Sequence, residues 1–343
     1  MKRGFVLGKF MPPHAGHLFL CESAAAMVDR LTVLVCWLPD DPIPGEQRLA
    51  WMRELLPHAR VVGHGEIVPQ HPDDSPDFWP IWRAIVAAAH PEPIDRLFAG
   101  EGYGAELARQ VGGTFVPLGA RALAADPNGL GGTSATAIRA DPWGEWRWLP
   151  PPVRAHYAHR IVLHGVESTG KSVLAEQLAR HFGTLWVPEY GRTHAETYGL
   201  EMDAADLLLI GEAQSATIAA AARACTRRVF ADTDALMTAA WARMMLGHVP
   251  PALLAHPKAD LYLHCAADVP WVNDGTRIYG EDDTRSRFDG MCRDVLADTG
   301  VRWVELAGDW DARFAAAVTA IETMQAPGNP TASATFDLGA QRE

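Results

Sequence analysis

Short apolar runs alternate with alanine-rich stretches along most of this chain. The run "RLTVLVCWL" is followed by "EQRLAWMRELL", and "WRAIVAAAH" is followed by "IDRLFAG". Apolar runs that alternate with helical stretches are typical of βαβ units, because two parallel strands need a crossover connection, usually a helix, between them. The alternation therefore predicts an α/β fold built on parallel sheets.

A proline run divides this alternation into two parts. Prolines 150–152 stand in "WRWLPPPVRAHYAHR", and proline cannot continue a helix or a central strand. A new apolar run, "RIVLHG", follows, and 343 residues are more than one ordinary domain needs. We expect two parallel-sheet domains, residues 1–152 and residues 153–327, followed by a flexible tail over residues 328–343 that is rich in small and turn residues.

The composition limits the partners of the chain. It has 30 basic and 42 acidic residues and a net charge of -12, whereas nucleic-acid-binding surfaces need a basic footprint. The five cysteines form no C-x-x-C pair, which favours buried thiols in a reducing compartment. No stretch reaches the ~18 apolar residues of a membrane helix, and "MKRGFVLGKF" lacks the apolar region of a signal peptide. We expect a cytoplasmic protein without nucleic-acid or membrane partners; its oligomeric state, a homo-oligomer included, stays open.

The stretch "GVESTGKS" follows the run "RIVLHG" and matches the phosphate-binding pattern G-x-x-x-x-G-K-[ST]. In such a loop backbone N–H groups surround a phosphate at a helix N-terminus, Lys171 reaches the outer phosphates, and the Ser172 hydroxyl can bind Mg²⁺. The helical stretch "VLAEQLARHF" that follows favours this interpretation over coincidence. The residues expected to hold ATP and Mg²⁺ here are Gly165, Glu167, Ser168, Thr169, Gly170, Lys171 and Ser172.

Acidic residues end two further apolar runs of the second half. Glu189 ends "LWVPE", and Asp232 and Asp234 follow "RRVFA". Carboxyl ends of parallel strands are where open α/β sheets bind ligands. A carboxylate there can hold Mg²⁺ or take a proton from an attacking hydroxyl. We expect Glu189 or Asp232 to be the base and Asp232 to join Ser172 at the metal, while Asp234 is either a substrate contact or a helix N-cap.

An arginine-rich stretch, "RIYGEDDTRSRFDG", lies further along the chain and contains Arg277, Arg285 and Arg287. Arginines that close over the phosphates of a phosphoryl-transfer enzyme neutralise the transition state and exclude water. The alternative is a solvated charged loop. Arg285 is the residue that we expect at the ATP.

The first half has two polar turns of its own. "GKFMPPHAGH" places His14 and His17 at a strand-to-helix turn, where imidazoles can donate to a phosphate. "GGTSATAIRADP" places Ser134, Thr136 and Arg139 at the start of a short helix, which is typical of an anion site. The alternatives are buried structural histidines and an ordinary Ser or Thr cap.

These motifs together resemble a known family. "GKFMPPHAGH" with "TSATAIR" is similar to the paired motifs of the nucleotidyltransferase superfamily. That pair, followed by "GVESTGKS", "EYGR", "DTD" and "WVNDGTR", resembles the NadR family, the bifunctional nicotinamide mononucleotide (NMN) adenylyltransferases and ribosylnicotinamide kinases. The resemblance covers residues 1–325 in matching order. It implies an N-terminal Rossmann-like nucleotidyltransferase domain and a C-terminal P-loop kinase domain.

The resemblance implies two steps of NAD salvage. The second half would phosphorylate nicotinamide riboside with ATP to give NMN, and the first half would join NMN to the α-phosphate of ATP to give NAD and pyrophosphate. His14 and His17 would stabilise the α-phosphate, and Ser134, Thr136 and Arg139 would hold the β- and γ-phosphates. Gly8, Lys9 and Phe10 would belong to the same ATP site. The expected substrate contacts are Trp79, Trp82, Tyr190, Arg192, Asp234, Trp271 and Asp274.

Two departures from the family leave alternatives open. Pro188 precedes "EYGR", and the alanine run 218–223 lies where a second aromatic is expected, so the group that stacks on nicotinamide stays open, with Trp186 one alternative. The first motif begins at Gly8, which leaves no room for the DNA-binding helix-turn-helix of regulatory members. Two alternative functions stay open: a kinase whose first half only senses NAD or ATP, and an NAD-responsive regulator. The presence of His14, His17 and Arg139 favours a first half that is itself an enzyme, because a pure sensor does not need residues that stabilise a transition state.

Overall fold

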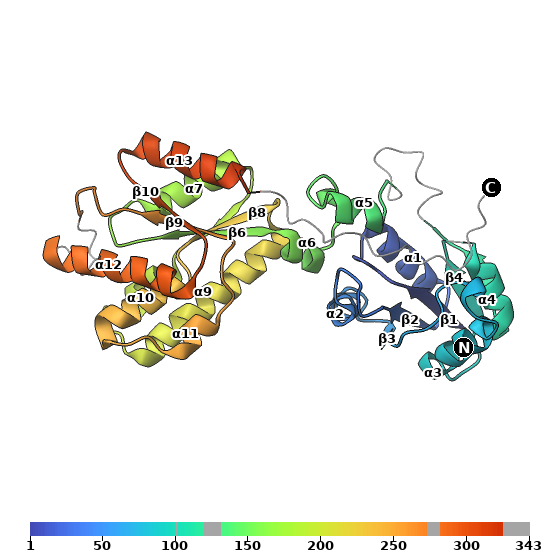
Figure 1. Cartoon of the computed structure of the whole chain (residues 1–343). Helices are drawn as coiled ribbons and strands as arrows, with labels where there is room; N and C mark the ends of the chain where they lie inside the picture. The colour runs from blue at the N-terminus through green and yellow to red at the C-terminus, as the bar shows by residue number, and fades with distance from the viewer. Residues whose placement is uncertain (101, 120–131, 273–281, 325–343) are drawn as a thin grey trace. The chain divides into compact units, whose positions relative to one another are not determined.

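The computed structural model of the protein describes residues 1–100, 102–119, 132–272 and 282–324. The chain divides after Val153 into two compact units (Figure 1). Helix α6 (Pro151–Tyr157) runs across this division and begins at a proline, which is tolerated in a first helical turn because its missing N–H would have no partner there. The proline run therefore starts a helix as well as separating two units.

The first unit is an open parallel sheet with the strand order β3-β2-β1-β4-β5. Every strand pairing in it is parallel. The strands are β1 (Arg3–Gly8), β2 (Arg30–Cys36), β3 (Arg60–His64), β4 (Arg96–Ala99) and β5 (Thr114–Pro117). The helices are α1 (Ala15–Ala26), α2 (Gly45–Leu55), α3 (Phe78–Ala89), α4 (Tyr103–Val111) and α5 (Ala135–Ala140), with short 3-10 turns at Pro72–Asp74 and Trp146–Trp148.

The central strand β1 is buried on both faces. Phe5 and Leu7 pack with residues of α3 and α4 on one face, and Val6 packs with residues of α1 and α2 on the other. Successive side chains of a strand point to opposite faces, so an uninterrupted apolar strand is what a doubly covered parallel sheet requires.

The second unit repeats this architecture with the strand order β10-β9-β6-β8-β7, again all parallel. The strands are β6 (His159–His164), β7 (Leu185–Val187), β8 (Arg228–Asp232), β9 (Leu261–Cys265) and β10 (Trp303–Leu306). The helices are α7 (Lys171–His181), α8 (Tyr190–Tyr198), α9 (Ala204–Ala224), α10 (Ala235–Leu246), α11 (Pro251–Ala255), α12 (Asp282–Thr299) and α13 (Trp310–Glu322). Two parallel α/β domains confirm the predicted fold class.

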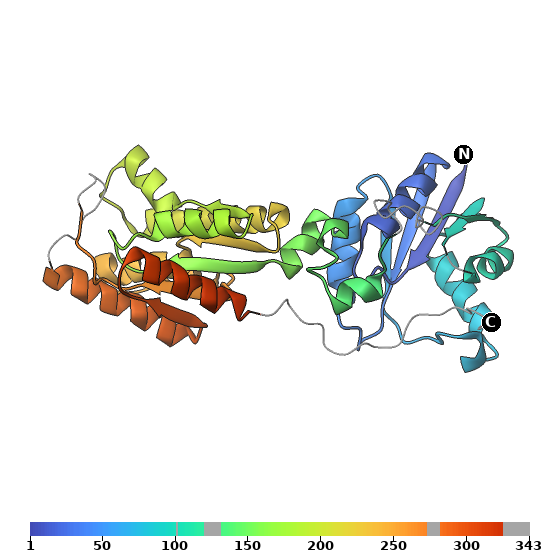
Figure 2. The ribbon, with the colours of Figure 1, turned by 90° about the horizontal axis from the view of Figure 1, so that it is seen from above.

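Helices cover both faces of the second sheet. Helices α7 and α13 lie on one face, and α9, α10 and α12 lie on the other (Figures 1 and 2). The core under α7 and α13 contains Ile161 and Leu163 of the central strand β6 and Leu178 of α7. In both units the first strand is central and later strands lie on both sides of it; in the second unit β7 forms the edge and β8 lies between it and β6. Ligands of such sheets bind at the carboxyl ends of the strands where the direction of building reverses.

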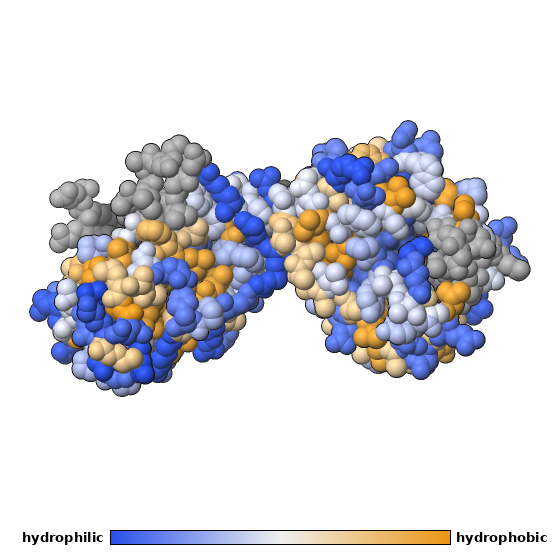
Figure 3. Space-filling model, turned by 180° about the vertical axis from the view of Figure 1, so that it is seen from behind, coloured by the Kyte–Doolittle hydropathy of each residue, from blue (hydrophilic) through white to orange (hydrophobic). Residues whose placement is uncertain are grey.

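The five cysteines are all buried and free, as predicted. On the face seen in Figure 3, each unit carries mostly hydrophilic residues with smaller hydrophobic patches among them. Within the described residues, every helix is too short or too polar to cross a membrane.

Candidate nucleotide sites

The first candidate site is the turn that follows β1. Phe10 has a left-handed backbone, with φ 47°, and its side chain is 2% exposed. Its ring folds back over Gly8, where an added Cβ would lie 3.2 Å from a ring atom. The Phe10 side chain therefore anchors the turn in the core, and the place of this residue in the ATP site stays a prediction.

His14 and His17 lie together at the start of α1. His14 is the N-cap residue, and its Nδ1 accepts a hydrogen bond of 3.1 Å from the Gly16 backbone N–H. The proton of the neutral ring is therefore on Nε2. Burial lowers the pKa of His14 to about 4. The His17 ring centroid lies 3.8 Å from that of His14. Burial and the His14 ring lower the pKa of His17 as well, so both imidazoles are neutral donors at pH 7.

A buried ion cluster supports this turn. Asp41 accepts hydrogen bonds from the Lys9 Nζ at 3.2 Å and from an Arg48 Nη at 2.6 Å. Arg48 is fully buried and also donates to the Lys9 backbone carbonyl at 2.7 Å. Burial lowers the pKa of Arg48, and the Asp41 carboxylate opposes this effect. The sequence analysis missed Arg48 and Asp41; the one available signal was an arginine inside the apolar helical stretch "EQRLAWM".

The second motif of the first unit reaches the turn. Arg139 is 7% exposed, and its Nη1 donates to the Met11 carbonyl at 2.6 Å. Ser134 caps α5 by accepting from the Ala137 N–H at 3.1 Å, and the Thr136 hydroxyl accepts from Arg139 at 3.4 Å. The structure thus brings the two predicted motifs together. Ser134 acts as a helix N-cap, which was the alternative to an anion-binding role.

The two tryptophans predicted at the substrate differ in position. Trp82 is 1% exposed in the core, and its indole N–H donates to the Pro69 carbonyl at 3.0 Å. This burial places Trp82 in the fold and not at a ligand surface. Trp79 is partly buried against the same core cluster.

The second candidate site is the P-loop, which follows β6. Gly165, Ser168 and Gly170 have left-handed φ values of 121°, 61° and 81°. At Gly165 an added Cβ would lie 2.6 Å from the Cys265 carbonyl oxygen, so only glycine fits. The Lys171 Nζ donates to the Val166 carbonyl at 3.0 Å. The predicted loop thus has the curved backbone that phosphate binding requires.

Two carboxylates stand beside the P-loop. The Ser172 hydroxyl donates to Asp232, which is 2% exposed. The other oxygen of Asp232, Oδ1, is buried and makes no hydrogen bond within the described residues. Burial, together with the nearby Asp232 charge, raises the pKa of Glu189 to about 7, and Lys171 opposes this shift. A carboxylate with a pKa near the working pH is suited to general base catalysis.

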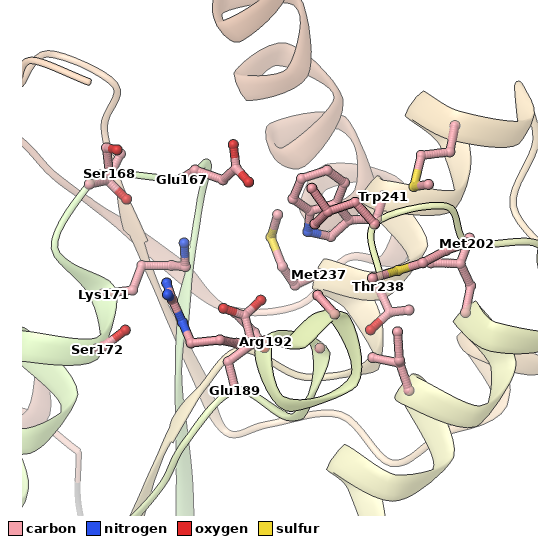
Figure 4. Close-up of a pocket in the computed structure, with 18 of the residues that line it drawn as sticks. Glu167, Ser168, Lys171, Ser172, Glu189, Arg192, Met202, Met237, Thr238 and Trp241 are labelled. Atoms are coloured by element: carbon pink, nitrogen blue, oxygen red, sulfur yellow. The ribbon is translucent and has the colours of Figure 1, made fainter. Parts of the chain in front are cut away.

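A cavity of about 400 Å³ extends from the P-loop to Glu189; Asp232 is not among its lining residues. Figure 4 shows Lys171, Glu189 and Arg192 at one end and Met237, Thr238 and Trp241 at the other. The predicted residues that line it are Glu167, Ser168, Thr169, Gly170, Lys171, Ser172, Glu189 and Arg192. The lining residues that the sequence analysis missed include Met202, Met237, Thr238, Trp241 and Met245. The cavity therefore has a polar end and an apolar end.

Other predicted residues of the second half do not line this cavity. Asp234 accepts from the Leu236 and Met237 N–H groups and, at 2.6 Å, from the Tyr262 hydroxyl. Both of its oxygens are used, so the capping alternative is the one observed. Tyr190 begins α8. The Trp271 side chain is partly buried beside Val272, whose N–H and carbonyl pair with the Ser168 hydroxyl.

Arg285 also lies away from the cavity lining. It is 7% exposed and donates to the Val269 carbonyl at 2.7 Å. In this structure it therefore holds the loop after β9, and its role at the ATP stays a prediction. Asp274 and Arg277 fall outside the described residues.

The two sites define a class of protein. Each unit has a polar turn at the carboxyl end of its central strand, and in the second unit this turn is a P-loop with carboxyl groups, those of Glu189 and the buried Asp232, beside it. This arrangement is typical of enzymes that transfer groups from nucleotides.

Comparisons with known proteins agree with this class. Residues 160–313 match the family described as AAA domain. The chain is 26% identical to the "Trifunctional NAD biosynthesis/regulator protein NadR" of Salmonella typhimurium over 348 residues, which are 94% of this chain and 83% of the relative. It is also 26% identical to the protein of that name in Escherichia coli over 349 residues, with the same coverage.

Two solved structures are similar over nearly the whole chain. "NadR protein in complex with NAD and AMP-PNP" has a TM-score of 0.72 at 21% identity, and "NadR protein in complex with NR" has a TM-score of 0.74 at 22% identity. Each comparison covers 97% of this chain and 98% of the other. The chain is a NadR-like protein.

The pKa of Glu189 predicts a pH effect on stability. Between its ordinary value of 4.5 and about 7, the folded protein keeps a proton that the unfolded chain has lost, so this group's contribution to stability falls as pH rises through that window. Glu189→Gln should remove this fall and raise the melting temperature at pH 8 relative to the parent, but not at pH 4.5. Melting curves of both proteins from pH 4.5 to 8 test this. The exposed Glu196→Gln on the same helix is the control, and parallel curves for Glu189→Gln and its parent would contradict the assignment.

The geometry of His14 predicts its protonation state. Its ring should stay neutral, with the proton on Nε2, from pH 8 down to pH 5, because burial lowers its pKa to about 4 and the Gly16 N–H occupies Nδ1. The ¹⁵N shifts of the imidazole report both properties. The urea-unfolded protein, whose histidines titrate near ~6.5, is the control. A protonation midpoint above pH 6 for His14 in the folded protein would contradict the prediction.

Proposed function

We propose that this chain is a bifunctional NAD salvage enzyme. Its second half phosphorylates nicotinamide riboside with ATP to give NMN, and its first half transfers the adenylyl group of another ATP to NMN to give NAD and pyrophosphate. The observation that carries the proposal is that each unit has a separate phosphate-binding turn at its central strand, one with His14 and Arg139 and one with Lys171 and Glu189. The names of the NadR relatives, which mention NAD biosynthesis and complexes with NAD, AMP-PNP and NR, support a role in NAD biosynthesis.

In the kinase half Glu189 is the base. It lines the cavity beside the P-loop, and its pKa of about 7 lets it accept a proton near neutral pH. The 5′-hydroxyl oxygen of the riboside attacks the γ-phosphorus, its proton passes to Glu189, and the bond to the bridging oxygen breaks to release ADP. Lys171 and Arg192 supply positive charge at the transferring group. Asp232 is less suited to this role, because it accepts a hydrogen bond from the Ser172 hydroxyl.

The oxygen donors beside the P-loop fit Mg²⁺. Within the part of the chain that the structure describes, no group of three or more His, Cys, Asp or Glu side chains could hold a metal. Mg²⁺ is commonly bound by one or two protein oxygens together with substrate phosphates. The Ser172 hydroxyl and the buried, unpaired Oδ1 of Asp232 are two such donors. When bound there, Mg²⁺ would neutralise charge on the phosphates.

In the adenylyltransferase half the chain acts by position and hydrogen bonding. A phosphate oxygen of NMN attacks the α-phosphorus of ATP, and the bond to the bridging oxygen breaks to release pyrophosphate. The His14 Nε2–H donates to the α-phosphate as its charge grows, and His17 lies beside it. Ser134, Thr136 and Arg139 hold the β- and γ-phosphates, with the Lys9 ammonium near the same turn. The step needs neither a protein nucleophile nor proton transfer.

Incubation of the protein with ATP, Mg²⁺ and nicotinamide riboside tests the proposal. The products should be ADP, NMN, pyrophosphate and NAD. Formation of NMN without NAD would leave a kinase whose first half only senses nucleotides, and the absence of both would overturn the proposal.

The two sites should be separable by single substitutions. Lys171→Ala removes a cation from the second site only, so this variant should not form NMN from the riboside but should still convert added NMN to NAD. His17→Ala removes a donor from the first site only, so it should accumulate NMN and lower the rate of NAD formation ~10² to 10³-fold, about 3 to 4 kcal/mol. Product analysis by chromatography, with melting curves as the folding control, measures both. Full adenylyl transfer by His17→Ala would contradict its assigned role.

The apolar end of the cavity should bind the pyridine ring. Trp241 and the methionines line it opposite Lys171 (Figure 4), and Trp241 supplies an aromatic surface where Pro188 and the alanine run do not. Trp241→Ala should raise the KM for nicotinamide riboside ~10-fold and leave the KM for ATP unchanged, because loss of one stacked aromatic costs ~1 to 3 kcal/mol. Trp241→Phe is the matched control that keeps a ring. Equal riboside KM values for the parent and Trp241→Ala would place the pyridine ring elsewhere.

A further inference from the structure

A second cavity, of about 320 Å³, borders the P-loop. It shares Thr169, Gly170 and Val173 with the first cavity. Its remaining walls come from α7 and α13, which cover one face of the sheet (Figure 1). The base and the methionine wall of the first cavity come instead from Glu189 and from elements on the side of α9 and α10. The P-loop therefore separates two cavities of similar size.

An exposed tryptophan forms one wall of the second cavity. Trp310 is the first residue of α13, and its side chain is 56% exposed. Its ring lies directly against Gly170, where an added Cβ would be 2.4 Å from a ring atom. Its ring therefore presents a large, flat, apolar surface to solvent directly beside the P-loop, within the second cavity.

A buried arginine holds this wall in place. Arg313 is 1% exposed, and its guanidinium lies 5.5 Å from the centroid of the Trp310 ring. It donates to the Gly308 carbonyl at 2.9 Å, to Ala266 at 3.2 Å and to Thr169 at 3.4 Å. One side chain thus links the P-loop, the end of β9 and the start of α13. The position of Trp310 relative to the loop is therefore fixed by charged hydrogen bonds.

The geometry of phosphoryl transfer assigns the two cavities. The attacking and leaving oxygens lie in line with the transferred phosphorus, so the acceptor and the nucleoside of the donor leave the P-loop in opposite directions. The cavity with Glu189 takes the acceptor hydroxyl. The cavity with Trp310 is then left for the nucleoside of the triphosphate.

We infer that Trp310 is the stacking surface for the base of the nucleoside triphosphate that donates the phosphoryl group. This inference rests on the proposed kinase activity of the second half. The ring of a nucleobase is flat and apolar on its faces, which matches the exposed indole, and the Arg313 guanidinium supports the indole through a cation–π contact. Trp310 contacts only the base, so it should contribute to ATP binding and not to the chemical step.

Kinetics of the full-length protein test this assignment. ADP formation that depends on nicotinamide riboside reports the kinase half alone. Trp310→Ala should raise the KM for ATP ~10-fold, because stacking of one base on an aromatic is worth about that factor or more. The kcat and the KM for the riboside should change less than twofold. Trp310→Phe should stay close to the parent, and Trp241→Ala should show the reverse pattern between the two substrates.

Inorganic tripolyphosphate separates stacking from damage to the loop. It has no base, so its inhibition constant should be the same for the parent and for Trp310→Ala. A rise in that constant equal to the rise in the ATP KM would mean that the substitution disturbs the P-loop through Gly170, and it would overturn the stacking role. An unchanged ATP KM in Trp310→Ala would also overturn it.

Fluorescence tests the inference without turnover. AMP-PNP should quench the tryptophan fluorescence of the parent more than that of Trp310→Phe, whereas tripolyphosphate should quench both equally. A protein that lacks kinase activity but shows this difference would overturn the proposed function and retain the base-binding surface. Equal quenching of the two proteins by saturating AMP-PNP would overturn the surface itself.

Discussion

The close approach of Gly165 to the end of β9 is the constraint on which the second site depends. A Cβ at this position would lie 2.6 Å from the Cys265 carbonyl oxygen, and the backbone has φ 121°. Any side chain would push the loop off the sheet and move Lys171 and Ser172 with it, since both follow within the same turn. The two cavities that share Thr169 and Gly170 would change together. One glycine thus sets the positions of both the donor and the acceptor sides.

The turn of the first unit is held in a different way. Here a non-glycine residue, Phe10, takes a left-handed φ of 47°, a conformation that persists only where the surroundings enforce it. The surroundings are its own buried ring, the Arg48–Asp41 pair and the hydrogen bond from Arg139 to Met11. A buried charge is costly unless it is paired and hydrogen-bonded, and Arg48 meets this condition through Asp41 and the Lys9 carbonyl. In the first unit, buried side-chain ion pairs and hydrogen bonds hold the turn in its conformation, whereas in the P-loop a glycine allows it.

Local patterns of sequence predicted the sheets and both phosphate turns, because strand alternation and loop motifs depend on neighbouring residues. They did not predict groups that act across the fold. Arg313 and Thr169 are 144 residues apart, and nothing near Trp310 marks it as a neighbour of the P-loop. Trp241 lies on α10, whose buried residues surround the helix, so its sequence looks like core. Asp234 had the expected residue type, but the N-terminus of α10 and the Tyr262 hydroxyl occupy both of its oxygens. Arg285 donates to the Val269 carbonyl through Nη1 only, and its buried Nε and Nη2 make no hydrogen bond within the described residues.

The charge of the whole chain and the charge of its sites have opposite signs. With a net charge of -12, the long-range field of the protein does not favour the approach of a nucleotide, so local cations must supply the attraction. Lys171 and Arg192, which line the cavity, are the candidates in the second unit, and Lys9 and Arg139 are the candidates in the first. The two histidines add hydrogen bonds without charge, because burial keeps them neutral. Under the proposed function, the cations of the first site would bind the triphosphate before and after reaction, whereas the neutral imidazoles would respond to the charge that develops at the α-phosphate.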